Sequence, residues 1–144
     1  MAVTNAQGSV IYWSTTTVLS TVISISNVIG YNGPSGSAPI IDATHLASTA
    51  KEKVMGLADE GQIALDMFYD PADTGQTRLR ECRASRVKGH WAVKILQSTT
   101  QRYQLDGKGY CTGFAIAGSV DQMVKVTATI EITGAVSLTT VATA

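Results

Sequence analysis

Alternation of apolar and polar residues is the clearest pattern along this chain, and it predicts strands. In residues 62–69 the apolar face carries Ile63, Leu65, Met67 and Tyr69, and residues 124–133 repeat the pattern over ten positions. A period of two is typical of a strand with one buried face. Further strands are expected at residues 9–14, 21–30, 40–41, 91–95, 103–106 and 110–118.

Glycine and proline mark the expected turns. Residues 31–39 (YNGPSGSAP) predict a turn cluster, and Gly107-Lys108-Gly109 predicts the tip of a hairpin. Gly134 predicts a turn or bulge before a last short strand at residues 135–138. The two ends, residues 1–8 and 139–144, are expected to be mobile.

One helix is predicted within this β pattern, at about residues 72–86. Asp70 can accept a backbone N–H as its N-cap, and Gly89 is expected to end it. Leu79 and Cys82 lie on the face expected to be buried against the sheet. The outward face then carries Arg78, Arg80 and Glu81.

A polar insertion at about residues 42–61 separates two strand-like runs. It is longer than an ordinary connection between strands, so it is either disordered or used in function. Its large apolar residues are too few to fold alone, and we expect the segment to become ordered against a partner. The apolar residues expected to anchor it are Val54, Met55 and Leu57.

Composition narrows the fold and the function. The chain has 144 residues, 18 threonines and 12 serines, and β-branched residues favour strands. We therefore expect one domain over residues 1–144 with an α+β, mostly β fold. It would be a β-sandwich or flattened barrel of about seven to eight strands, with one flanking helix and one long polar loop. The charged fraction is 15% and the net charge is zero, which removes the basic surface of a nucleic-acid-binding protein.

Candidate catalytic and metal-binding residues are few. His45 and His90 have no partner at metal-ligand spacing, so we expect a surface loop residue and a strand-edge residue. Cys82 and Cys111 lack a CxxC partner and are expected to be buried free thiols, and Gly107-Lys108-Gly109 lacks the spacing of a P-loop. We expect neither an enzyme nor a cofactor. No apolar run is long enough to span a bilayer and the first residues do not form a signal peptide, so we expect synthesis in a cytoplasm.

A family resemblance emerges from the order of several short motifs. The run IIDATHLASTAKEKVMGLADEG, followed by the strand QIALDMFYD, resembles the central signature of the major tail tube proteins of long-tailed bacteriophages. The later Tyr103-Gln104-Leu105-Asp106-Gly107 run and the closing Ile132-Thr133-Gly134 also fit that family. The residues expected to form an assembly interface are Asp42, Thr44, Lys51, Glu52, Lys53, Val54, Met55, Gly56, Leu57, Asp59 and Gly61.

The resemblance implies a structural virion protein. Members form six-membered rings that stack into a hollow tail tube, which conducts DNA during ejection. Neighbouring subunits join sheet edges, and a long loop reaches the next ring. The implied partners are other copies of the chain, a tape measure protein inside the tube, and tail terminator and baseplate proteins at its ends. DNA would pass without sequence-specific binding, and no membrane is involved. Two alternatives remain open from sequence: a tail terminator or head–tail completion ring, and the inner tube of a secretion system.

Overall fold

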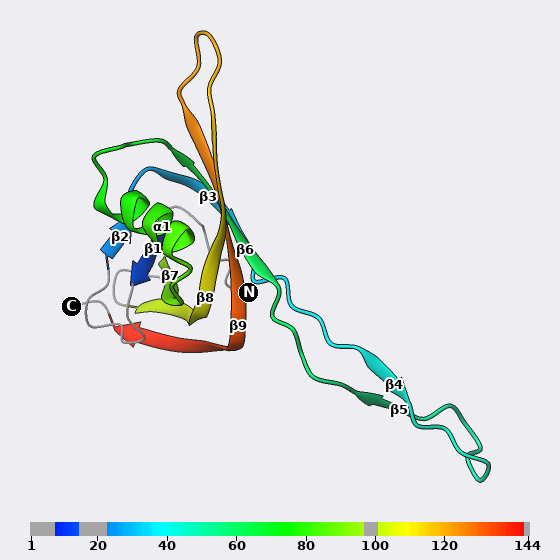
Figure 1. Cartoon of the computed structure of the whole chain (residues 1–144). Helices are drawn as coiled ribbons and strands as arrows, with labels where there is room; N and C mark the ends of the chain where they lie inside the picture. Colours follow the sequence, from blue (N-terminus) through cyan, green and yellow to red (C-terminus); the bar gives the residue numbers. More distant parts are fainter. Residues whose placement is uncertain (1–7, 15–22, 97–100, 143–144) are drawn as a thin grey trace.

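The computed structural model describes residues 8–14, 23–96 and 101–142. Within these ranges the chain forms nine strands and one helix (Figure 1). In chain order they are β1 (Val10–Ser14), β2 (Ile23–Ile25), β3 (Val28–Asn32), β4 (Ile40–Asp42), β5 (Lys53–Met55), β6 (Gln62–Phe68), α1 (Thr74–Ser85), β7 (Gly89–Leu96), β8 (Gln101–Ala117) and β9 (Lys125–Ala142). Seven strands make one antiparallel sheet in the order β2-β1-β7-β8-β9-β6-β3, and β4 and β5 pair separately.

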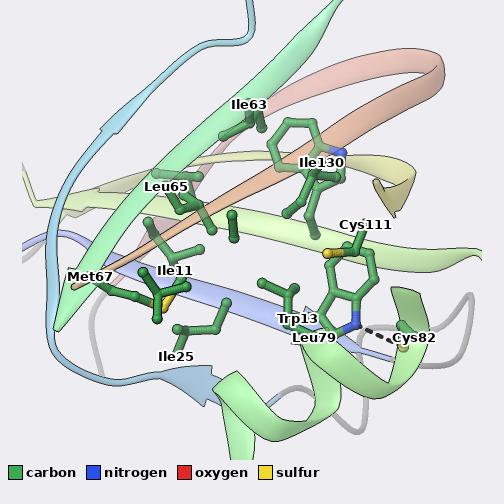
Figure 2. Close-up of a cluster of buried hydrophobic side chains, with 14 of the residues drawn as sticks. Ile11, Trp13, Ile25, Ile63, Leu65, Met67, Leu79, Cys82, Cys111 and Ile130 are labelled. Carbon is green, nitrogen blue, oxygen red and sulfur yellow. Dashed lines mark hydrogen bonds between the residues drawn. The ribbon is translucent and has the colours of Figure 1, made fainter. Parts of the chain in front are cut away.

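The seven-stranded sheet curls around the hydrophobic core, and α1 packs on its inner side (Figure 1). The alternation predicted for β6 and β9 is confirmed, because Ile63, Leu65 and Met67 face the core opposite the buried residues of β9. Figure 2 shows these side chains packed with Trp13 and Leu79. The fold is therefore mostly β with a single helix, as predicted.

The strand predicted at residues 21–30 is wrong in one respect, because the chain divides it in two. Asn27 has a left-handed backbone (φ 62°) and separates β2 from β3. These two short strands pair at opposite edges of the sheet, β2 with β1 and β3 with β6. Only two residues separate them, so the curled sheet is held nearly closed at this seam by the chain itself. We call residues 26–27 the seam.

Helix α1 begins later than predicted. Asp73, rather than Asp70, is the N-cap and accepts a hydrogen bond from the Gln76 backbone N–H at 3.0 Å. Asp70 instead accepts from the Ala72 N–H in the turn before the helix. The helix ends at Ser85, its C-cap Arg86 has a left-handed backbone, and Gly89 is already part of β7. The predicted inward face is confirmed. Leu79 and Cys82 are buried and Arg80 is exposed, while Arg78 is half-buried.

The predicted hairpin tip at Gly107-Lys108-Gly109 is also wrong, since β8 runs through it without a turn. Glycine is needed there for close packing: a Cβ on Gly107 would lie 3.0 Å from the Trp91 ring, and one on Gly109 would lie 2.5 Å from the Glu131 carbonyl oxygen. The actual turn between β8 and β9 spans residues 118–124, at the end of a hairpin that projects beyond the sheet (Figure 1).

The bulge predicted at Gly134 is present. Gly134 has a φ of 81°, and the pairing of β8 with β9 shifts register beside it. β9 then continues to Ala142, so residues 139–142 belong to the sheet. Residues 1–7 and 143–144, where mobile ends were expected, lie outside the described ranges. Both cysteines are buried and free, as predicted. The single helix in the described ranges has 12 residues and cannot span a membrane.

Candidate functional site

The polar insertion forms a long arm that leaves the body between β3 and β6 (Figure 1). We use "the arm" for residues 33–61. The arm is a β-ribbon: Ile40, Ile41 and Asp42 pair with Met55, Val54 and Lys53. Backbone hydrogen bonds between Ser37 and Asp59 (2.8 Å) and from Gly56 N–H to the Pro39 carbonyl (2.7 Å) continue the pairing toward the body. The strand predicted at residues 40–41 is thus β4, and the segment predicted as a loop contains the short strand β5.

Three of the motif residues at the outer end of the arm serve to shape it. The Thr44 N–H donates to Asp42 Oδ1 at 3.0 Å, and the Thr44 hydroxyl accepts from the Glu52 N–H at 2.9 Å. Hydrogen bonds from the Thr44 hydroxyl and N–H lower the pKa of the Asp42 carboxyl. The Asp-x-Thr motif thus closes the end of the ribbon, which explains the residue types at this spacing.

Two contacts between polar side chains lie within the arm near this end. Lys51 Nζ lies 3.9 Å from Asp42 Oδ2, and His45 Nε2 lies 3.5 Å from Glu52 Oε2. All four side chains are more than half exposed, so these pairs add little stability. Lys53 is exposed as well. His45 is a surface residue of this arm, as predicted.

Glycine and one aspartate turn shape the arm between the β4–β5 pairing and the body. A Cβ on Gly56 would lie 2.9 Å from the Pro39 ring, and Gly61 has a φ of 77°. Asp59 Oδ1 accepts from the Gly61 N–H at 3.0 Å, which closes the turn that leads into β6. Asp59 and Gly61 thus shape the turn that joins the arm to β6.

Large apolar side chains cover both faces of the ribbon. Ile40 and Met55 form a cross-strand pair on one face, and Ile41 and Val54 form a pair on the other. Their exposed fractions are 58%, 68%, 54% and 55%, and Leu57 is 93% exposed. Sequence reasoning identified Val54, Met55 and Leu57 but missed Ile40 and Ile41. Ile40 and Ile41 were assigned to an incoming strand. The apolar residues Val54, Met55 and Leu57, on the other side of the polar stretch, could have signalled that the two runs pair as a hairpin.

Outside the arm, the polar contacts of the body are structural. His90 lies in β7 between β1 and β8, so the predicted strand-edge position is wrong. Its Nε2 lies 3.1 Å from Asp106 Oδ2, with both side chains mostly buried. Across the described ranges, no three His, Cys, Asp or Glu side chains gather in a way that could hold a metal ion. A cleft of about 410 Å³ lies at the base of the arm, lined by Ala58, Asp59, Glu60 and residues 132–135.

Comparison with known proteins gives a consistent result. A family model described as phage tail tube, TTP, lambda-like matches residues 2–102. No curated protein shows a significant match to the chain.

Solved structures of phage-like tails share the fold. The tail of an empty GTA particle with C6 symmetry superposes with a TM-score of 0.71 at 17% identity, over 95% of this chain and 99% of that chain. The SPP1 tail tube gives a TM-score of 0.70 at 7% identity, over 92% of this chain and 77% of that one. A chain of the six-fold symmetrised anti-feeding prophage baseplate gives 0.65 at 6% identity, over 92% and 91%.

Proposed function

Because the chain belongs to the lambda-like family of phage tail tube proteins, and is thus a structural protein of the virion tail, we propose that six copies close into a ring and that the rings stack into a hollow tube for DNA. Of the ring-forming classes considered from the sequence, the family match supports the tail tube over a terminator or a secretion-system tube. The family is structural, which agrees with a non-enzymatic role. Six-fold symmetry is a property of the GTA tail that shares this fold.

The free edges of the sheet are the observation that carries this proposal. β7 pairs with residues 102–109 of β8, whereas residues 110–117 pair with β9 alone. On the other side, β3 pairs with β6 and ends the sheet. Residues 110–117 of β8, with β9, β6 and β3, therefore form a four-stranded section that is open at both edges. Unpaired strand edges promote association, and closing a ring pairs every one of them.

The direction of the strands suits such a ring. All neighbours in this section are antiparallel, so β8 and β3 run in opposite directions. The β8 edge of one copy can then pair with the β3 edge of the next as an ordinary antiparallel pair. Six copies would supply ~24 strands at ~4.8 Å each, which gives a barrel roughly 37 Å across between backbones. Allowing for side chains on the inner wall, this is wide enough for a DNA double helix.

The sheet face turned away from the core is suited to line this channel. Along β9 the residues that alternate with the core are Lys125, Thr127, Thr129, Glu131 and Thr133. On the neighbouring β6, the exposed Asp66 accepts a hydrogen bond from the Thr127 hydroxyl at 3.2 Å. Hydroxyl groups with few charges offer phosphates little attraction, so DNA could slide past without being held.

The arm supplies the contact between rings in this proposal. It projects away from the four-stranded section and carries all of the residues predicted for assembly, Asp42 to Gly61 (Figure 1). The same function requires a tape measure protein in the channel, and terminator and baseplate proteins at the tube ends.

Negative-stain microscopy of edge variants tests the ring. Ile29 on β3 and Ile116 on β8 are 51% and 50% exposed, so Ile29→Lys and Ile116→Lys would place a charge at each edge without touching the core. We expect long hollow tubes from the unmodified protein and folded monomers from both variants. Ala84→Lys, on the exposed side of α1, is the matched control and should form normal tubes. Isolated rings from the unmodified protein would favour a terminator, and tubes from either edge variant would contradict the proposed pairing.

A further inference from the structure

Both faces of the arm carry an exposed apolar pair, which is unusual for a contact that meets one surface. The pair Ile40 and Met55 and the pair Ile41 and Val54 lie on opposite faces, and all four side chains are more than half exposed. A ribbon that docks on one flat wall needs one apolar face and one polar face. In this ribbon, each of the two faces carries an apolar pair at these positions.

The body of the subunit does not cover either pair. The paired segment lies far out along the arm, away from the curled sheet and α1 (Figure 1). β4 and β5 pack chiefly on each other. An isolated two-stranded ribbon is marginally stable in water, so this one needs contacts from outside the subunit.

Resting on the proposed stack of rings, we propose that the arm of one subunit inserts between two adjacent subunits of the next ring, so that each face contacts a different copy. The apolar area supports two walls. Each pair offers on the order of 100–200 Å², far below the ~800 Å² per partner of a standard interface. Both faces together with Leu46 and Leu57, which are fully or almost fully exposed, come much closer to that requirement.

The charges of the arm agree with apolar walls. Lys51 Nζ lies 3.9 Å from the Asp42 carboxylate within the arm itself, and Glu52 Oε2 lies 3.5 Å from His45 Nε2. The two walls need not supply an opposite charge for Lys51 or Asp42. Apolar surfaces of other copies therefore fit the two apolar pairs of the arm.

This arrangement couples ring closure to stacking. The slot for an arm exists only where two subunits already stand side by side, so a free monomer lacks the binding site. Arms therefore bind to a completed ring in preference to a single subunit, and each bound arm also fastens two neighbours together. Growth from an existing ring is favoured over random association in solution.

Photo-cross-linking of mixed tubes tests directly whether the arm inserts between two adjacent subunits. A photoreactive residue is placed at position 40, at position 41, or at both, and each labelled protein is diluted into excess unmodified protein before assembly. With few labelled chains, a single label should give two-chain products, and the double label should give three-chain products. The Ile40 and Ile41 labels should also reach different residues of the other copies, as read by mass spectrometry.

Two double variants give a second measurement. Ile40→Ser with Met55→Ser weakens one face, and Ile41→Ser with Val54→Ser weakens the other; Ala43→Ser with Ala50→Ser is the control. Each face variant should raise the protein concentration needed for tubes by about tenfold or more, with monomer melting unchanged. Three results would contradict insertion of the arm between two subunits. They are a double label that gives no three-chain products, cross-links confined to the labelled chain, and loss of assembly from variants of one face alone. Absence of tubes from the unmodified protein would instead contradict the proposed function.

Discussion

Gln76 is the side chain that joins the helix to the seam of the sheet. It is 1% exposed and makes three hydrogen bonds with backbone groups of other segments. Its Nε2 donates to the carbonyls of Ser26 (3.1 Å) and Phe68 (2.9 Å), and its Oε1 accepts from the Asp70 N–H (3.0 Å). We predict that Gln76→Leu opens this junction while keeping the size and helix propensity of the side chain.

The magnitude follows from those three bonds. A neutral hydrogen bond contributes about 0.5–1.5 kcal/mol net, and a partner left unsatisfied in a buried place costs at least as much. Leucine fills the space but satisfies none of the three backbone groups, so we expect a loss of about 2–4 kcal/mol. For a chain of this size, that loss corresponds to a fall in melting temperature of roughly 5–15 °C.

The assay is thermal unfolding of the monomer, combined with hydrogen exchange. Glu81→Leu, on the exposed side of the same helix, controls for the added leucine and should change the melting temperature little. Faster exchange should appear at the Asp70 N–H and around the seam, where Ser26 N–H donates to Asp73 at 3.3 Å. A Gln76→Leu protein that melts with the control would refute the role of this side chain in closing the sheet.

Four further predictions concern the core, a thiol and the arm. Leu79→Ala should cost about 2–5 kcal/mol in chemical unfolding, because Leu79 is fully buried, whereas Arg80→Ala should cost less than about 0.5 kcal/mol. Burial, with Cys82 nearby, raises the pKa of Cys111 from 9.0 to about 11, so stability present below pH 9 is lost as the pH rises toward 11. Cys111→Ala should remove this part of the pH dependence in urea titrations. Amides of residues 51–59 should exchange rapidly in monomers and slowly in tubes, and equal protection in both states would argue against ordering by a partner. Glu52→Lys breaks the contact with His45 and leaves three adjacent lysines, so we expect folded monomers with unchanged melting and shortened or absent tubes by microscopy.

Long alternating strands and the buried side of the helix could be read from the sequence. β6 and the first half of β9 alternate without exception, and a slip by one residue would expose the whole core face. Leu79 and Cys82 lie three residues apart, which places them on one face of any helix that includes both. In both cases the spacing of apolar residues along the chain shows which side chains face the core.

The errors arose where one residue type serves two structural purposes. Glycine at positions 107 and 109 admits the Trp91 ring and a neighbouring carbonyl, and sequence alone does not distinguish that need from a turn. Asn27 breaks a strand that otherwise alternates well, because asparagine tolerates a left-handed backbone. Both Asp70 and Asp73 are followed by residues suited to a helix, so the sequence allows either as the N-cap. In the structure Asp73 is the N-cap, and its carboxylate accepts hydrogen bonds from the Gln76 and Ser26 N–H groups.

The register of the pairing within the arm could not be predicted for a different reason. β4 and β5 have three residues each, and such short runs do not fix a register without knowledge of the turn between them. The assignment of the insertion to assembly came from the resemblance, and the structure adds which of its residues shape the ribbon and which face outward.

The order of strands in the sheet has a consequence for synthesis of the protein. β9 lies between β8 and β6, yet it emerges from the ribosome after both of them. Until β9 is made, β6 and β3 pair with no other strand of the sheet, and the four-stranded section does not exist. Its contacts join residues far apart in the chain, an arrangement that folds slowly. For the proposed ring, a nascent or truncated chain therefore lacks the four-stranded section that pairs with its neighbours, so folding of the subunit precedes assembly.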